Sequence, residues 1–286
     1  MKVDGLDVSV YTVPTEEPES DGTFTWTSTT VVVVEPHAGG QTGLGFTYAS
    51  AACATLIREL LAEVVVGADP MDVRGTWAEM VAAIRNLGRP GICSMAIAAV
   101  DTGLWDLKAR LLGQPLAGLL GAVRDRVPVY GSGGFTSYTD DELVAQLTGW
   151  AQGDGIGRVK MKVGTAWGSR PRRDLERVAR VRQALGDEVE LYVDANGGYS
   201  RKQAVRLGQA FADQGVTWFE EPVSSDDLEG LREVRDRCPA DVAAGEYGYD
   251  LAYFRRMVQA RAATRSHSVI PAQRDTSAWR QSTAPA

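Results

Sequence analysis

The sequence predicts an α/β protein with two domains, an N-terminal α+β domain followed by a (β/α) barrel of the TIM type that is incomplete. Three features lead to this prediction. β-like runs occupy the first fifty residues, helical patterns follow to residue 112, and strand and helix alternate from residue 126 onward. We place the α+β domain at residues 1–125, the barrel at 126–259 in about five units, and an atypical tail at 260–286.

Composition excludes several classes of function. The chain of 286 residues carries 30 Lys and Arg against 37 Asp and Glu, and its net charge of −7 argues against a nucleic-acid partner. The longest wholly apolar runs, such as Val31 to Val34, are far shorter than the roughly 18 residues of a membrane span. Because the N-terminus also lacks the apolar core of a signal peptide, we expect a cytoplasmic protein that does not enter membranes.

Cysteine and histidine are scarce. Cys53, Cys93 and Cys238 are widely spaced without a C-x-x-C pair, so we expect buried small residues rather than a disulfide framework or a thiolate zinc site. Two histidines, His37 and His267, are too few for hydrolases that bind metals through several imidazoles. We expect His37, which lies in a turn, to be structural or solvated.

The first domain begins with strands and continues with helices. A small antiparallel sheet is predicted from β-like runs at Val8 to Val13, Thr23 to Glu35 and Thr42 to Tyr48. Helical periodicity follows at Ala51 to Val66, Val73 to Leu87 and Ser94 to Leu112. The last helix has Ser94 as a candidate N-cap and Gly113 as a stop signal.

The second domain alternates strand and helix, which indicates a parallel sheet. Strands are predicted at Val127 to Tyr130, Arg158 to Val163, Glu190 to Asp194, Thr217 to Glu220 and Val242 to Gly245. Helices are predicted at Asp141 to Gln152, Arg172 to Leu185, Arg201 to Gln214 and Leu228 to Arg237. No dinucleotide-type glycine-rich turn follows the first strand, so the pattern favours a barrel over a Rossmann fold.

The tail does not continue this alternation. From Ala260 to Ala286 it is rich in Ala, Arg, Ser, Thr and Pro, and a sixth strand–helix unit is not recognisable. A barrel of eight units typically needs about 250 residues, more than the chain provides after residue 125. Two interpretations stay open: a disordered extension, or the product of a shifted reading frame in a GC-rich gene.

Three acidic residues stand at the ends of successive predicted strands. Asp194, Glu220 and Glu246 are separated by 26 residues each, one strand–helix unit, so they occupy equivalent places at the C-terminal rim of a barrel. Converging carboxylates repel one another unless a cation lies between them, and an all-oxygen set with open positions suits Mg²⁺. Alternatively, strand-terminal acids are helix N-caps or solvated loop residues.

The preceding strand carries two lysines. Because side chains alternate along a strand, Lys160 and Lys162 share one face and Val159, Met161 and Val163 share the other. In a barrel the apolar face meets the helices, so both lysines point inward, toward the acidic rim or an anionic substrate. A lysine beside another cation and a dication loses proton affinity and can serve as a base. Alternatively, this is a wet edge strand with solvated lysines.

These motifs together resemble the enolase superfamily, and within it the mandelate racemase / muconate lactonizing enzyme family. The resemblance runs from about residue 1 to residue 259 and is closest to the mandelate racemase subgroup. It is carried, in order, by Ala99 to Lys108, Lys160-Met161-Lys162, Asp194-Ala195-Asn196, Glu220-Glu221-Pro222 and Gly245-Glu246. The resemblance implies an N-terminal capping domain, a Mg²⁺ cofactor and, as is well established for this superfamily, a Lys or His base.

Carried over residue by residue, the resemblance implies that Asp194, Glu220 and Glu246 bind Mg²⁺, which binds the carboxylate of a small-molecule substrate. Lys162 is then the base that removes the proton α to that carboxylate, through an enediolate. Lys160 helps to hold the carboxylate and lowers the pKa of Lys162, and Asn196 hydrogen-bonds near the metal. Glu221 points away from Glu220 by alternation, which favours a supporting or structural role.

Substrate selection in the family comes from loops of the N-terminal domain. They correspond here to Pro14 to Gly22 and Phe46 to Ala52. The first of these is acidic, and a solvated turn is the alternative interpretation.

The chain departs from the subgroup in its tail. Members usually place an Asp on the sixth strand and a His on the seventh, whereas this sequence reads Ser266-His267-Ser268-Val269-Ile270 and then stops. We interpret His267 as a feature of the tail, not as the displaced catalytic histidine.

Two functional hypotheses result. The first is a Mg²⁺-dependent acid-sugar dehydratase or a racemase/epimerase of α-hydroxy or sugar acids. The second is a truncated, non-catalytic metal-binding remnant, whose open barrel leaves strand edges unpaired and predicts homo-oligomers or aggregation. An unrelated barrel hydrolase has little support because histidines are few.

Overall fold

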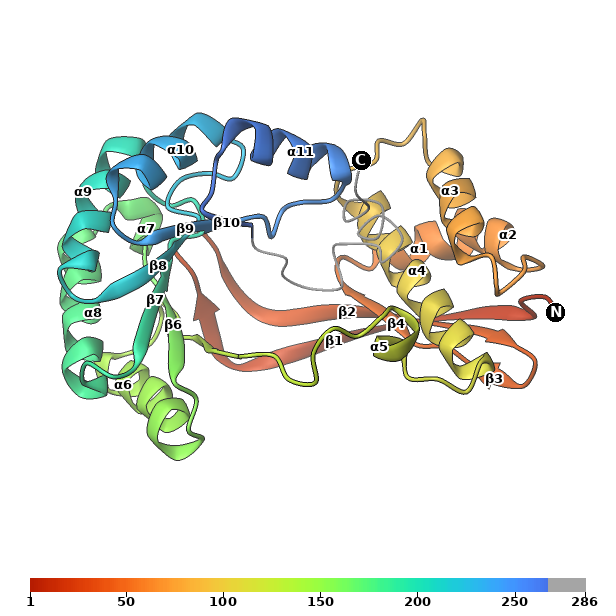
Figure 1. Cartoon of the computed structure of the whole chain (residues 1–286), viewed down its shortest axis with the longest axis horizontal. Helices are drawn as coiled ribbons and strands as arrows, with labels where there is room; N and C mark the ends of the chain where they lie inside the picture. The colour runs from red at the N-terminus through yellow and green to blue at the C-terminus, as the bar shows by residue number, and fades with distance from the viewer. Residues whose placement is uncertain (267–286) are drawn as a thin grey trace.

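The computed structural model describes residues 1–266, which form two lobes joined by a long hairpin (Figure 1). The tail predicted at 260–286, including His267, therefore lies mostly outside the described residues. Within residues 1–266, no helix is long and apolar enough to cross a membrane.

The N-terminal lobe contains an antiparallel sheet made of β1 (Gly5–Ser20), β2 (Thr25–Ala38), β3 (Gln41–Thr42) and β4 (Gly45–Tyr48). β1 continues through Pro14 to Ser20, a stretch that we predicted as a turn. Among the strands that the structure describes, it pairs only with β2, with a register shift between Pro14 and Glu19. Proline is tolerated there because an edge strand has no second ladder that needs its missing N–H.

Helices pack against one side of this sheet. They are α1 (Ala52–Leu56), a π-helical turn η1 (Ile57–Leu61), α2 (Ala62–Val65), α3 (Val73–Ala83), α4 (Ile92–Leu111) and α5 (Leu116–Leu119). The predicted N-cap of α4 was wrong: Gly91 caps it, with φ of 81°, and the Ser94 hydroxyl inside the helix donates to the Arg89 carbonyl. Gly113, with φ of 64°, follows the helix end as predicted.

The sheet and α4 approach each other closely at a glycine. A Cβ atom on Gly45 would lie 1.9 Å from the carbonyl oxygen of Ala99 in the middle of α4. The central helix can therefore lie directly on the backbone of β4, and apolar side chains on both sides form one buried core.

Up to residue 266, the second lobe contains a parallel sheet of six strands in the order β10-β9-β8-β7-β6-β5. The strands are β5 (Gly131–Gly133), β6 (Arg158–Lys162), β7 (Glu190–Asp194), β8 (Val216–Glu220), β9 (Asp241–Ala244) and β10 (Arg265–Ser266). β10 pairs with β9, so a sixth strand begins where the sequence showed no recognisable unit. Among the described residues the sheet does not close into a full barrel.

The first strand of this sheet lies later than predicted. Val127 and Val129, which suggested a strand, are 68% and 63% exposed. Pairing with β6 starts at Gly131, where a Cβ atom would lie 2.4 Å from the Trp150 ring. Only glycine fits beneath that indole. This contact therefore determines where along the chain the strand begins.

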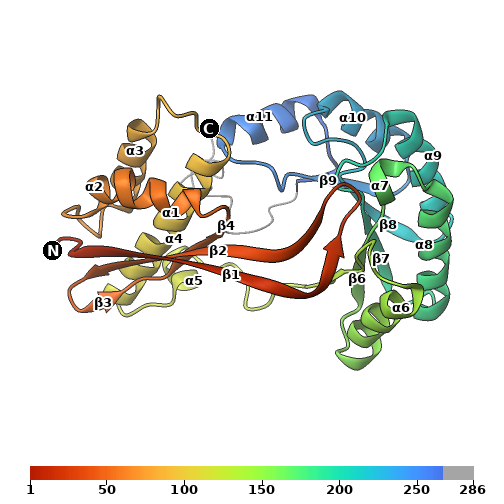
Figure 2. The same cartoon turned by 180° about the vertical axis from the view of Figure 1, so that it is seen from behind.

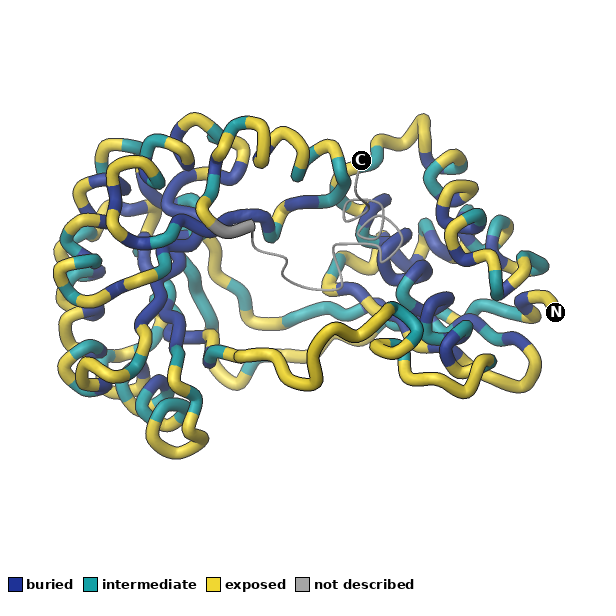
Figure 3. The backbone as a smooth tube through the Cα atoms, in the orientation of Figure 1, coloured by how far each residue is buried: buried dark blue, intermediate teal, exposed yellow. Residues whose placement is uncertain are grey.

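Helices cover the outer face of the sheet (Figure 1). They are α6 (Asp140–Thr148) with a π-helical end η2 (Gly149–Gly153), α7 (Thr165–Gly168), α8 (Pro171–Leu185), α9 (Arg201–Ala212), α10 (Leu228–Arg237) and α11 (Leu251–Ala260). Val159, Met161 and Val163 are fully buried beneath them, as the alternation of β6 predicts. Figure 3 shows buried residues along the parallel strands and in the centre of the N-terminal lobe.

The β1–β2 hairpin connects the two lobes (Figure 2). At its tip, the Ser20 carbonyl accepts from the Thr136 N–H at 2.7 Å and the Gly22 carbonyl from the Trp167 N–H at 2.9 Å. A Cβ atom on Gly22 would lie 2.7 Å from the Val163 carbonyl oxygen, so the tip lies directly on the C-terminal end of β6. The predicted α/β fold, an α+β capping lobe followed by strand–helix units on a parallel sheet, is confirmed.

Candidate active site

Three carboxylates lie at the C-terminal rim of the parallel sheet. Asp194 ends β7 and Glu220 ends β8, and the two are paired in register across these strands. Glu246 follows the end of β9. The structure thus places all three predicted acids at the ends of neighbouring strands, where barrel enzymes carry their chemistry.

Both predicted lysines point at these acids. Lys160 Nζ lies 2.7 Å from Glu220 Oε2 and 3.4 Å from Asp194 Oδ2, and Lys162 Nζ lies 2.6 Å from the same Asp194 oxygen. The Lys160 ammonium also lies 5.3 Å from the centre of the Tyr130 ring, an attractive cation–π distance. The two cations compensate the charge of buried carboxylates that would otherwise repel one another.

Burial disfavours the charged form of each of these groups, and the neighbouring charges decide whether its pKa is finally raised or lowered. Burial would raise the pKa of Asp194, but the charges of Lys162 and Lys160 outweigh it and lower that pKa. Burial and the charge of Asp194 raise the pKa of Glu220 and of Glu246. Burial alone would lower the pKa of Lys162, but the negative charge of Asp194 raises the pKa of Lys162 above its ordinary value. We predicted a lowered pKa for Lys162; that prediction assumed a dication beside it.

Asn196 connects the acids. Its backbone N–H donates to Asp194 Oδ1 at 3.0 Å and its side-chain Nδ2 to Glu246 Oε1 at 3.2 Å. A left-handed φ of 45° turns the chain sharply after β7 and makes this reach possible. The remaining side-chain oxygen, Oδ1, is buried without a hydrogen-bond partner among the described residues.

Glu221 does not point away from the rim, and this corrects the expectation from alternation. The strand ends at Glu220 and Glu221 adopts a left-handed φ of 37°, so alternation no longer applies. The side chain is 1% exposed and its two oxygens have no hydrogen-bond partner among residues 1–266. Burial and the nearby charge of Glu246 raise its pKa. The strand end at Glu220 was the signal in the sequence that could have revealed this.

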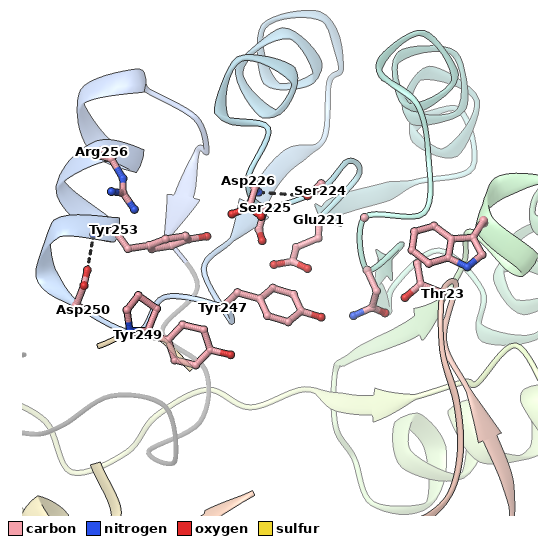
Figure 4. A pocket seen from close by; sticks show the side chains of 14 residues that line it. Thr23, Glu221, Ser224, Ser225, Asp226, Tyr247, Tyr249, Asp250, Tyr253 and Arg256 are labelled. Atoms are coloured by element: carbon pink, nitrogen blue, oxygen red, sulfur yellow. Dashed lines mark hydrogen bonds between the residues drawn. The ribbon is translucent and has the colours of Figure 1, made fainter. Parts of the chain in front are cut away.

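A cavity of about 520 Å³ opens beside these acids (Figure 4). Glu221 and Tyr247 point into it from the rim, and α11 contributes Tyr253 and Arg256. The full lining is Thr23, Pro90, Trp167, Asn196, Gly197, Glu221, Ser224, Ser225, Asp226, Tyr247, Tyr249, Asp250, Tyr253 and Arg256. Many hydroxyl groups beside acidic groups suit a polar, hydroxylated ligand better than an apolar one.

The N-terminal lobe contributes Thr23 and Pro90 to this cavity. Thr23 belongs to the hairpin tip, next to the first predicted loop, whereas the second predicted loop, Phe46 to Ala52, does not line it. In the tip, Asp21 accepts from the backbone N–H groups of Thr23 and Phe24, which stabilises the turn. Sequence reasoning did not find Pro90, because nothing in its neighbourhood predicts contact with a distant strand end.

The remaining histidine and the cysteines lie apart from the site. His37 lies in β2, not in the turn that we predicted. Its ring nitrogens lie 3.0 Å from Asp7 Oδ2 and from Thr42 Oγ1, which agrees with a structural role. All three cysteines are buried and free of disulfides, as predicted. His267 lies outside the described residues.

The donor set suits a hard cation by its chemistry. In the present arrangement, no three His, Cys, Asp or Glu side chains of residues 1–266 are grouped closely enough to hold a metal ion. The lysine ammonium groups lie between the carboxylates instead. Yet the candidate ligand atoms at the rim are all oxygens, and Asn196 Oδ1 and the Glu221 oxygens are buried acceptors without a donor among residues 1–266. Such acceptors are costly unless a cation or a hydrogen-bond donor meets them.

Two family models match the chain, one for each lobe. The model of the mandelate racemase / muconate lactonizing enzyme N-terminal domain matches residues 6–121. A second model, described as enolase C-terminal domain-like, matches residues 142–266.

Curated relatives include enzymes that act on sugar acids. L-talarate/galactarate dehydratase of Salmonella typhimurium is 32% identical over 256 residues, covering 86% of this chain and 63% of the relative. 3,6-Anhydro-alpha-L-galactonate cycloisomerase of Streptomyces coelicolor is 36% identical over 231 residues, covering 79% of this chain and 62% of the relative. The chain thus spans a little under two thirds of the length of these relatives.

Solved structures share the fold. A mandelate racemase/muconate lactonizing enzyme-like protein from Rubrobacter xylanophilus is 51% identical, with a TM-score of 0.89 over 93% of this chain and 73% of its own. L-Talarate dehydratase from Polaromonas sp. JS666, complexed with Mg and L-glucarate, is 32% identical, with a TM-score of 0.88 over 98% of this chain and 77% of its own.

Proposed function

This chain belongs to the mandelate racemase / muconate lactonizing enzyme family, and from that membership we propose that it acts on the proton α to the carboxylate of a sugar acid. The observation that carries the proposal is the pair of inward lysines on β6, whose ammonium groups contact Asp194 and Glu220 at the rim. A base and a cation-binding set are thereby adjacent, which is what proton abstraction next to a carboxylate requires.

Each rim residue has a role in this proposal. Asp194, Glu220 and Glu246 would hold Mg²⁺. When bound, Mg²⁺ would stabilise the negative charge that develops on the substrate carboxylate and would offset the charge of Asp194. Lys160 would hold the substrate carboxylate. Asn196, anchored to Asp194 and Glu246, would orient the acids and donate toward the substrate.

Lys162 would be the base. Its neutral nitrogen takes the α proton, the C–H electron pair moves toward the carboxylate, and an enediolate results. In a dehydration, the electron pair of the enediolate would then form a C–C double bond while the C–O bond on the neighbouring carbon breaks, and the leaving hydroxyl, protonated by solvent, would depart as water. Of the two outcomes, dehydration is our first proposal and racemisation or epimerisation the second, because the relatives include dehydratases and cycloisomerases.

The cavity supports a hydroxylated substrate. Ser224, Ser225, Tyr247 and Tyr249 present hydroxyl groups, and the Glu221 oxygens are acceptors without donors among the described residues. The relative from Polaromonas binds L-glucarate, a hydroxylated acid of this kind. We therefore propose acid sugars as the substrate class.

The test is deuterium exchange at the α carbon. The protein is incubated with Mg²⁺ in D₂O with galactarate, L-talarate, glucarate, gluconate or arabinonate, and proton NMR follows loss of the α signal and formation of dehydrated product. We expect exchange with at least one acid. Lys162→Met should abolish it, while Lys202→Met, a change of an exposed lysine on α9, should preserve it. Absence of exchange with every acid, together with Mg²⁺ binding, would favour the alternative of a non-catalytic metal-binding protein.

A further inference from the structure

Two buried charged residues on α8 lie one turn apart, beneath the end of β6. Asp174 is 0% exposed and Arg177 is 1% exposed. Both contact the short backbone segment that leaves β6 at Lys162, so they act on the chain at the position of the proposed base.

Arg177 connects the ends of two strands through carbonyl oxygens. Its Nη1 donates to the Lys162 carbonyl at 3.1 Å, and its Nη2 donates to the carbonyls of Phe135 at 2.7 Å and Gly134 at 3.3 Å. The Lys162 N–H also donates to the Gly134 carbonyl, at 3.1 Å. One rigid guanidinium therefore fixes the backbone of Lys162 relative to the segment that follows β5.

Asp174 accepts hydrogen bonds from the same segment, whereas Arg177 donates to it. Its Oδ2 accepts from the Gly164 N–H at 3.2 Å and from the Tyr199 hydroxyl at 2.7 Å, while Oδ1 accepts from the Thr165 hydroxyl at 2.7 Å. The carbonyl of Lys162 and the N–H of Gly164 are thus each held by a buried charge of α8. Charge-assisted hydrogen bonds of this kind are stronger than neutral ones.

A guanidinium at this depth is costly to desolvate, and an apolar side chain of similar size would fill the space with less penalty. An apolar residue cannot, however, donate hydrogen bonds to the three carbonyl oxygens that Arg177 holds. We therefore attribute to Arg177 an effect on the position of the backbone that it contacts, rather than a gain in stability.

We propose that Arg177 is a positioning residue: by holding the Lys162 carbonyl, it directs the Lys162 side chain at the α carbon of the substrate. This rests on the proposed function, in which Lys162 is the base. Arg177 does not line the cavity, so it would not contact the substrate itself. Substrate binding through the metal site and Lys160 should not depend on it.

The same helix provides a matched control. Arg182 also donates to backbone carbonyls, those of Gln214 at 3.0 Å, Gly215 at 3.1 Å, Val189 at 2.8 Å and Gly186 at 2.6 Å. These carbonyls precede β7 and β8, at the end of the sheet opposite the rim. Arg177 and Arg182 therefore have similar hydrogen-bonding chemistry, but only Arg177 reaches the proposed base.

The experiment compares Arg177→Met, Arg177→Lys and Arg182→Met in steady-state turnover or α-proton exchange, per folded molecule as measured by circular dichroism. A displacement of about 1 Å at a reacting group can cost on the order of 100-fold in rate. We expect kcat to fall about 10- to 100-fold in Arg177→Met with KM within about twofold. Arg177→Lys, which can hold one carbonyl, should lose less, and Arg182→Met should keep kcat within about twofold. Equal losses of kcat in the two Met variants would overturn the proposal.

A second measurement does not need turnover. Hydrogen–deuterium exchange followed by mass spectrometry should show faster exchange of the amides of residues 162–164 in Arg177→Met or Arg177→Lys. In Arg182→Met, faster exchange should instead appear in residues 186–190 and 214–216. If the unmodified protein processes no acid, the proposed function fails, and this pattern alone decides about Arg177. Unchanged protection at residues 162–164 overturns its positioning role.

Discussion

The Lys162 ammonium lies 2.6 Å from the Asp194 carboxylate, directly across the register pair that joins β6 to β7. The proposed base is thus held by a proposed metal ligand. This contact favours the ammonium form, whereas proton abstraction needs the neutral amine. Metal binding and base activation therefore depend on the same carboxylate.

Magnesium should stabilise the fold. A ligand that binds only the folded state raises the free energy of unfolding, by about 2.7 kcal/mol at 100 times its Kd. We expect the melting temperature to rise with Mg²⁺ at constant ionic strength, and Asp194→Asn and Glu246→Gln to remove this rise. Asp227→Asn keeps a capping side chain on α10 but removes the charge that pairs with Arg201, so it should lower the melting temperature slightly and keep the Mg²⁺ response. A wild-type melt that does not respond to Mg²⁺ would exclude this metal site.

Lys160→Met should destabilise the protein strongly in metal-free buffer. Lys160 is buried and contacts both Glu220 and Asp194, so its loss leaves buried carboxylates with less compensating charge. Breaking such a buried pair typically costs about 3–5 kcal/mol. We expect urea unfolding to show a loss of this size and Mg²⁺ to recover part of it. The exposed control Lys202→Met should stay within about 0.5 kcal/mol, and equal losses in both variants would contradict the prediction.

Gly45→Ala should destabilise the N-terminal lobe, because its Cβ atom would lie 1.9 Å from the Ala99 carbonyl oxygen. Overpacking of this kind typically costs about 1–3 kcal/mol. Gly149→Ala is the matched control, since nothing lies within 4 Å of its Cβ position and its φ of −57° suits alanine. Calorimetry should show a lower melting temperature for the first variant and an unchanged or slightly higher one for the second. Equal effects would contradict the close packing of β4 on α4.

The cysteines should resist alkylation in the native protein. Burial raises the pKa of Cys53 and of Cys238 to about 11, so at pH 8 their reactive thiolate form is scarce. With a folded pKa above the unfolded value, each thiol contributes stability that is complete below about pH 8.5 and is lost as pH rises toward 11. Iodoacetamide labelling read by mass spectrometry should be slow from pH 7 to 9 and fast in urea. Rapid native labelling would show that these thiols are accessible.

The alternation of side chains along strands and the equal spacing of the acidic residues predicted the parts of the site that lie within regular strands. Alternation placed Lys160 and Lys162 on the inner face of β6, and the equal spacing of three acids placed them at neighbouring strand ends. Both follow from backbone geometry, which local sequence determines.

The parts that failed lie where regular backbone ends. Glu221 turns toward the cavity because its φ is 37°, a conformation that alternation does not describe. β5 starts at Gly131 because of the Trp150 ring, a contact with a residue of the following helix. Pro90 reaches the cavity only through the arrangement of the two lobes. Tertiary contacts decide such positions, and a local pattern carries no signal for them.

The hairpin contact on β6 also bears on the order of folding. The Thr136 N–H to Ser20 carbonyl bond joins residues 116 positions apart, and the Gly22–Trp167 contact spans a still longer stretch of chain. During synthesis on the ribosome, the hairpin tip is made long before the segments around Thr136 and Trp167 with which it forms hydrogen bonds. Because contacts between distant segments form slowly, the tip spends this interval without its binding surface. We therefore expect the contact between the hairpin tip and the end of β6 to form late in folding, and conditions that slow assembly of the parallel sheet should leave exposed the cavity edge that Thr23 lines.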